Sequence, residues 1–94
     1  DPSFRVLVGR FVSGLPERLG ELQAAAQESR LEEVQRLAHQ LKGAGGGYGF
    51  EQMTAPAHAL ERLAECGAPS AEIASALKGL GNVCDAIEAD WIDY

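Results

Sequence analysis

Residues 34–49 combine an amphipathic helix pattern with a cluster of glycines, and this combination constrains the fold most. Apolar or small residues recur every three or four positions and share one helix face: Val34, Leu37, Ala38, Leu41, Gly45 and Tyr48. Each glycine in a helix interior costs roughly 1 kcal/mol relative to alanine. Four glycines at 43, 45, 46 and 47 therefore cost about 3–4 kcal/mol, which is large against a domain stability of roughly 5–15 kcal/mol. We expect some of them to permit close helix packing or partner access, and Gly49 to end the helix.

His39 lies well off the apolar face of this helix. Lys42 and Gly43 follow one turn later, and Gly46 continues the same flank. The pattern predicts an imidazole at the edge of a bundle with almost no side-chain bulk on its C-terminal side. Gly43 and Gly46 would then clear space for another protein to reach the ring.

The remaining chain also shows helical periodicity. Apolar residues from Phe4 to Ala26 repeat every three or four positions over residues 3–27, but Pro16 follows Gly14 within this stretch. Proline breaks or kinks a helix interior, so this is either one kinked helix or a short helix followed by a longer one that begins near Pro16. A second helix is predicted from a capping box, with Ser29 as the N-cap and Glu32 three residues later.

A third helix is predicted within a few residues of Gly49, with Met53, Ala57, Leu60 and Ala64 as its core stripe. It starts either near Thr54, with Pro56 in its first turn, or near Glu51 with a kink. A fourth helix is expected from near Ser70 to about Asp90. The expected fold is an all-α, antiparallel up-down four-helix bundle that forms a single domain over residues 1–94.

Composition narrows the function classes. The net charge of −6 argues against binding to nucleic acids and to anionic membranes, both of which favour basic surfaces. There is no long apolar run and no signal-peptide pattern, and the cysteines Cys66 and Cys84 lack metal-site spacing. We expect Cys84 to be a buried reduced thiol in a cytoplasmic protein. Because the chain does not begin with Met, we expect it to be part of a longer protein.

Four polar residues are predicted to meet across the second and third helices. If the turn is centred near Phe50, His39 and Glu61 lie eleven residues from it on opposite sides, and Lys42 and His58 lie eight residues from it. Antiparallel helices rise equally per residue, so these pairs face each other. We expect Glu61 to bond His39 Nδ1, which orients the ring and leaves Nε2 as a nucleophile.

The motif His39-x-Leu41-Lys42-Gly43-Ala44, with Gly49 ten residues after the histidine, resembles the histidine-containing phosphotransfer (HPt) family. The Gly-Tyr-Gly-Phe run at 47–50 is most similar to the variant in chemotaxis-type kinases, in which a second histidine and a glutamate follow at the spacings of His58 and Glu61. Many members of the wider family carry a small polar residue, often Asn, where this chain has Gly47.

The resemblance implies that His39 is phosphorylated and passes the group to an aspartate of a response-regulator receiver domain. It implies a histidine kinase or a receiver as donor, Mg²⁺ on the receiver, and a phosphoryl carrier without its own ATP site or cofactor. Lys42 would offer positive charge to the incoming phosphoryl group, Glu61 would orient His39, and the role of His58 stays open. Partner docking is assigned to Gly43, Gly46, Gln35 and Arg36, and the domain is expected to be monomeric.

Other interpretations of the same residues exist. A bundle of this shape could bind receivers as an unphosphorylated scaffold, although the presence of both His39 and Lys42 disfavours this. His39, His58 and Glu61 could in principle ligate zinc, but His-x-x-Glu occurs only once, so no metal is expected. The glycine run lacks the order of a phosphate-binding nucleotide loop, and no strand precedes it.

Overall fold

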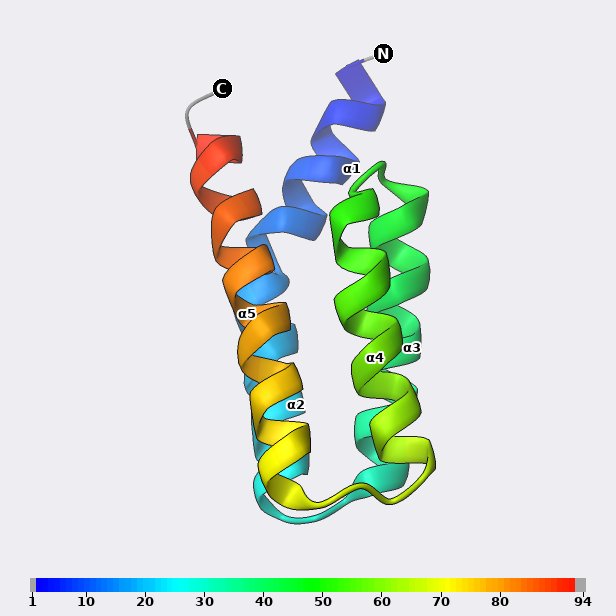
Figure 1. The fold of residues 1–94 in the computed structure, drawn as a ribbon. Helices are drawn as coiled ribbons and strands as arrows, with labels where there is room; N and C mark the ends of the chain where they lie inside the picture. Colours follow the sequence, from blue (N-terminus) through cyan, green and yellow to red (C-terminus); the bar gives the residue numbers. More distant parts are fainter. Residues whose placement is uncertain (1, 93–94) are drawn as a thin grey trace.

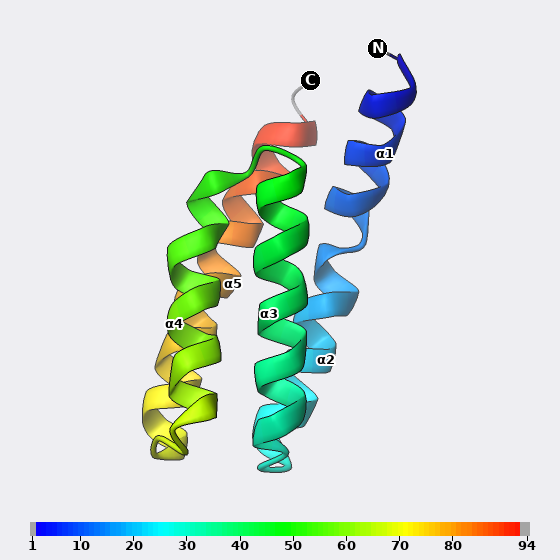
Figure 2. The ribbon, with the colours of Figure 1, turned by 90° about the vertical axis from the view of Figure 1, so that its right-hand side faces the viewer.

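The computed structural model describes residues 2–92, and these residues form helices and no strand. The elements are α1 (Pro2–Ser13), α2 (Leu15–Gln27), α3 (Leu31–Gly47), the short 3-10 helix η1 (Glu51–Met53), α4 (Thr54–Glu65) and α5 (Ser70–Ile92). Helices α1 and α2 are the two arms of one bent helix, and α2, α3, α4 and α5 run alternately up and down (Figures 1 and 2). The predicted all-α, antiparallel four-helix bundle is confirmed. It is elongated, with Cα extents of 42 × 19 × 19 Å.

The bend in the first helix lies at Gly14, because Pro16 cannot continue a helix with an unbroken backbone ladder. The Gly14 N–H still donates to the carbonyls of Arg10 (3.0 Å) and Phe11 (3.1 Å), which closes α1. Pro16 then occupies the first turn of α2, where its missing N–H has no intrahelical partner to lose. The break or kink predicted near Pro16 is therefore confirmed as a bend at Gly14, with arms of 12 and 13 residues.

The core is aliphatic and largely follows the predicted stripes. Its most deeply buried large side chains are Leu15, Leu22, Val34, Leu41, Met53, Leu60, Ile73, Leu80 and Cys84. Cys84 is a free thiol whose pKa is raised to about 11 by burial, whereas Cys66 is free and exposed. Two stripe positions in the first helix are displaced: Phe4 is half exposed, and Ala25 is buried where Ala26 was expected. The bend turns the start of α1 away from the bundle axis (Figure 2), which agrees with the exposure of Phe4.

Helices α2, α3 and α4 all end in a Schellman motif. In α3 the Phe50 N–H donates to the Gly45 carbonyl (2.8 Å), and Gly49 takes a left-handed φ of +89° as predicted. Gly67 does the same after α4, with φ +70°.

The predicted capping box at Ser29 is wrong. Ser29 has a φ of 57° and forms the left-handed residue of the α2 motif, in which the Arg30 N–H donates to the Ala25 carbonyl (2.9 Å). Arg30 is consequently the N-cap of α3, and it makes no side-chain capping bond. The tight turn from α2 into α3 fixes the Ser29 backbone in a conformation that cannot also cap the next helix.

The α3–α4 connection fixes the register of the two helices. A Cβ at Gly45 would lie 3.0 Å from Met53 Sδ and 3.3 Å from Met53 Cβ, so this glycine allows close packing against the residue that ends η1. Helix α4 begins at Thr54 with Pro56 in its first turn, which confirms the first of the two predicted starts.

Substitution of Ser29 by glycine should stabilise the domain by about 0.5–1 kcal/mol, because glycine adopts a left-handed φ without steric penalty. If Ser29 were a functioning N-cap, the same change would lower stability by a few tenths of a kcal/mol. Urea unfolding followed by circular dichroism gives the sign of the change. A loss of stability would contradict the assigned turn geometry.

Candidate functional site

The polar residues of the α3–α4 hairpin form a connected cluster on the surface. His39 Nδ1 lies 2.8 Å from Glu61 Oε2, across the two helices. The His39 side chain is 67% exposed, whereas that of Glu61 is only 14% exposed. The carboxylate therefore lies behind the imidazole, and the ring faces solvent.

Lys42 completes the cluster one turn after His39. Its Nζ donates to Glu61 Oε1 at 2.7 Å and contacts His58 Nδ1 at 3.3 Å. His58 Nδ1 is 3.8 Å from the nearest Glu61 oxygen, too far for a hydrogen bond. The structure therefore brings His39, Lys42, His58 and Glu61 together, with the hydrogen bonds to the carboxylate supplied by His39 and Lys42.

The partners assign the protons of both imidazoles. An ionised carboxylate only accepts hydrogen bonds, so neutral His39 carries its proton on Nδ1 and leaves the Nε2 lone pair free. A lysine ammonium only donates, so His58 accepts at Nδ1 and carries its proton on Nε2 when it is neutral. The two histidines thus adopt opposite tautomers within one cluster.

The electrostatics keep Glu61 ionised. The hydrogen bond from Lys42 makes the largest contribution to lowering the pKa of the Glu61 carboxyl below its ordinary value of 4.5. Burial opposes this shift, and the hydrogen bond from His39 lowers the pKa further. Each carboxylate oxygen accepts from a different donor. Glu61 is therefore a fixed, charged acceptor for His39 throughout the neutral pH range.

The surface beyond His39 is bare backbone. A Cβ built at Gly43, Gly46 or Gly47 would meet no atom within 4 Å, in contrast to Gly45. Gly43 and Gly46 are both helical, and neither carries a side chain that would block the approach to the imidazole. The absence of a side chain at Gly47 also removes any contact that a polar residue would make there.

The other two residues assigned to docking lie one turn before His39. Arg36 is exposed and forms a two-point hydrogen-bonded ion pair with Glu33 on the same helix, and Gln35 is half-buried. The partnership of Glu33 was not expected from the sequence, although its i,i+3 spacing from Arg36 is a recognisable signal. This ion pair places a guanidinium and a carboxylate together on α3, at the edge of the helix face that carries His39.

A family model described as Hpt domain matches residues 6–90 of the chain. The chain belongs to the Hpt family. Searches of the curated proteins and of the solved structures returned no match. Hpt domains are phosphocarrier modules of two-component signalling that interact with kinases and receiver proteins, so histidine phosphotransfer is the general function of this chain.

Within the described range 2–92 of this Hpt domain, no three His, Cys, Asp or Glu side chains are arranged to hold a metal ion. The helices in that range include none with both the length and the apolar content needed to span a membrane.

Replacement of Glu61 by glutamine should make the free energy of unfolding less sensitive to acidic pH. Because the folded-state pKa of Glu61 is depressed, its contribution is fully present above the unfolded pKa and is lost as the pH falls through the folded pKa. The free energy of unfolding should therefore fall more between about pH 5 and pH 3 in the parent chain than in Glu61→Gln. Parallel slopes in urea titrations would show that Glu61 is not held ionised by its partners.

Proposed function

We propose that His39 is the phosphoacceptor of this Hpt domain and that it reacts through Nε2. The observation that carries this proposal is the combination of an exposed ring and a carboxylate bonded to its Nδ1 (2.8 Å). The carboxylate holds the neutral ring in the tautomer whose free nitrogen points toward solvent, so the nucleophile needs no separate base.

Phosphoryl transfer to His39 requires no proton transfer at the imidazole. The Nε2 lone pair attacks the phosphorus of an aspartyl phosphate on a receiver domain, the P–O bond breaks, and the aspartate leaves as a carboxylate. The imidazole gains a P–N bond and a positive charge that is shared over the ring. The Glu61 carboxylate lies against Nδ1–H, where it stabilises this developing charge. The reverse step returns the phosphoryl group to a receiver aspartate.

Lys42 and His58 act around this centre. Lys42 uses Nζ contacts to Glu61 and His58, and its side chain is still 25% exposed. We assign it two tasks: holding the carboxylate in place and offering positive charge to the phosphoryl oxygens. His58 supports the position of Lys42 through its Nδ1. His58 and Glu61 lie three residues apart on α4. Their spacing is the basis for proposing that this domain is of the chemotaxis-kinase type.

The partner would dock over Gly43 and Gly46, with Gln35 and Arg36 at the edge of the contact. We propose a receiver domain that supplies both Mg²⁺ and the aspartate, and a histidine kinase or another receiver as the source of the phosphoryl group. The chain would then contribute a positioned nucleophile and a docking surface, and would act as a carrier without an ATP site of its own.

The second candidate function is an unphosphorylated scaffold that binds receivers. It needs the bare docking face at Gly43 and Gly46 but has no use for the bond between His39 and Glu61. Phosphate on the protein that is acid-labile and base-stable would distinguish the carrier from the scaffold.

His39→Gln should abolish phosphorylation, because glutamine has no nucleophilic ring nitrogen. Incubation with a ³²P-labelled receiver or kinase measures label on the chain, and circular dichroism verifies that the variant is folded. Labelling of His39→Gln at the level of the parent chain would rule out His39 as the acceptor.

Glu61→Ala should slow transfer by about 10- to 100-fold, since a hydrogen bond to a charged group contributes roughly 1.5–3 kcal/mol. The bundle should stay folded, because Glu61 lies at the surface edge of α4 rather than in the core. Single-turnover transfer rates, measured beside circular dichroism spectra, test both statements. An unchanged rate in the folded variant would remove Glu61 from the mechanism.

Gly46→Leu should reduce transfer at low partner concentration by about tenfold or more, equivalent to a loss of at least 1.4 kcal/mol in docking. A Cβ at position 46 meets no atom within 4 Å in the isolated domain, so folding should be unaffected. Gly79→Leu is the matched control, because Gly79 is an equally open helical glycine on α5. Equal transfer by the two leucine variants would refute the role of the bare surface.

A further inference from the structure

Two cationic side chains flank His39 at equal spacing along α3. Arg36 lies three residues before it and Lys42 three residues after it, so each is a neighbour of the imidazole on the helix surface. Lys42 is held by the Glu61 carboxylate (2.7 Å) and by His58 Nδ1 (3.3 Å), and only 25% of its side chain is exposed. Arg36, at 54% exposure, is the less constrained of the two.

Arg36 forms its ion pair with Glu33, one turn earlier on the same helix. Its Nη2 and Nε donate to the two oxygens of the Glu33 carboxylate. Both side chains are accessible to water, and an exposed ion pair contributes little because water competes for both charges. Glu33 and His39 lie at the same three-residue spacing on either side of Arg36. The guanidinium therefore has two alternative partners within one helical turn.

A phosphoryl group on His39 would lie close to the turn that carries Arg36. Side chains in an α-helix lean toward the N-terminus, over the turn that precedes their own Cα. A phosphoryl group carries about two negative charges and three acceptor oxygens, and a guanidinium can bind it through two parallel hydrogen bonds. It is therefore a stronger partner for Arg36 than the single charge of the Glu33 carboxylate.

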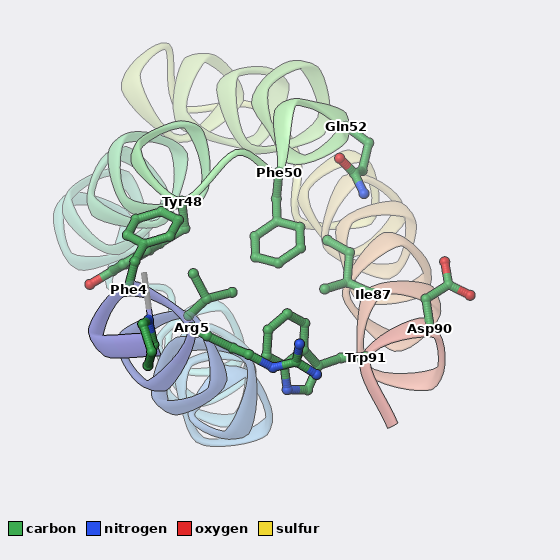
Figure 3. A pocket seen from close by; sticks show the side chains of 10 residues that line it. Phe4, Arg5, Tyr48, Phe50, Gln52, Ile87, Asp90 and Trp91 are labelled. Atoms are coloured by element: carbon green, nitrogen blue, oxygen red, sulfur yellow. The ribbon is translucent and has the colours of Figure 1, made fainter. Parts of the chain in front are cut away.

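Other arginines lie against aromatic rings elsewhere in the bundle. Arg5 lies over the ring of Trp91, 5.9 Å from its centroid, at the end where α1 begins and α5 ends (Figure 3). Arg18 lies over the ring of Phe11, 5.6 Å from its centroid. Helix α3 contains a single arginine, so Arg36 is the residue that brings a guanidinium to the phosphohistidine from its own helix.

We propose that Arg36 exchanges Glu33 for the phosphoryl group when His39 is phosphorylated. This inference rests on the proposed role of His39 and assigns Arg36 a contact with the phosphoryl group itself, beyond the edge of the docking surface. The exchange releases the Glu33 carboxylate at that edge. The phosphorylated and unphosphorylated domains then present different charges to a partner.

The released carboxylate keeps a cation nearby. The hydrogen bond from Arg36 makes the largest contribution to lowering the pKa of Glu33, burial opposes it, and the charge of Arg30 lowers the pKa as well. Arg30 therefore continues to favour the ionised form of Glu33 after Arg36 leaves.

A ³¹P titration of the phosphorylated domain tests the contact without a protein partner. Phosphoramidate, a small phosphoryl donor, modifies the imidazole directly, so docking does not enter the measurement. A bound guanidinium favours the dianion, so the second pKa of the phosphoryl group should be about 0.5 higher in Arg36→Gln than in the parent chain. Arg36→Lys should restore part of this difference. Arg62→Gln is the matched control, because Arg62 forms an i,i+3 pair with Glu65 on α4, and it should leave the pKa unchanged.

Glu33→Gln tests the exchange of partners. Removal of the competing carboxylate should lower the phosphoryl pKa more in the parent chain than in Arg36→Gln, where only the loss of a nearby negative charge remains. Circular dichroism verifies that each variant is folded. The same phosphoryl pKa in the parent chain and Arg36→Gln, or an equal effect of Glu33→Gln in both backgrounds, would overturn the proposal.

The ³¹P resonance that is followed is the one missing from His39→Gln. If His39→Gln gave the same ³¹P resonances as the parent chain, the assignment of His39 as phosphoacceptor would fail. That failure is distinct from an Arg36→Gln variant that is phosphorylated on His39 with an unchanged phosphoryl pKa.

Discussion

The hydrogen bond between His39 and Glu61 depends on the register of α3 against α4, and the proposed chemistry depends on that bond. The register is set at the turn between α3 and α4. Gly49 reverses the chain with a left-handed backbone, and Gly45 lets Met53 approach within contact distance. Equal rise along the two helices then carries this alignment to the level of His39. A side-chain contact between residues 22 positions apart is in this way determined by backbone features of the turn.

The glycine cluster divides into three physical roles. Gly45 is buried and serves packing, Gly49 serves the turn, and Gly43, Gly46 and Gly47 meet nothing in the isolated domain. Packing and turn geometry therefore account for only part of the helix-propensity cost of the cluster. The rest falls on residues beside or beyond an exposed imidazole, which agrees with a surface kept bare for a partner.

Sequence periodicity was sufficient for most of the fold, because buried aliphatic stripes decide which helix faces meet. The hairpin pairs His39–Glu61 and Lys42–His58 were also predictable, since they need only equal rise and a located turn. The Lys42–Glu61 bond was not, because it depends on side-chain conformations that spacing does not specify. Ser29 was misassigned because one short stretch fits both a helix start and a helix end, and the tight turn decides between them. The exposure of Phe4 likewise depends on how far the Gly14 bend turns α1 from the bundle, a tertiary property.

The central claim is that the Glu61 carboxylate fixes His39 as the Nδ1–H tautomer and leaves Nε2 to react. Long-range ¹H–¹⁵N correlation spectra of the ¹⁵N-labelled domain, recorded before and after phosphorylation, test this most directly. The account predicts that neutral His39 is protonated at Nδ1 and that phosphorus becomes attached to Nε2. A neutral ring protonated at Nε2, or a phosphoryl group on Nδ1, would contradict it.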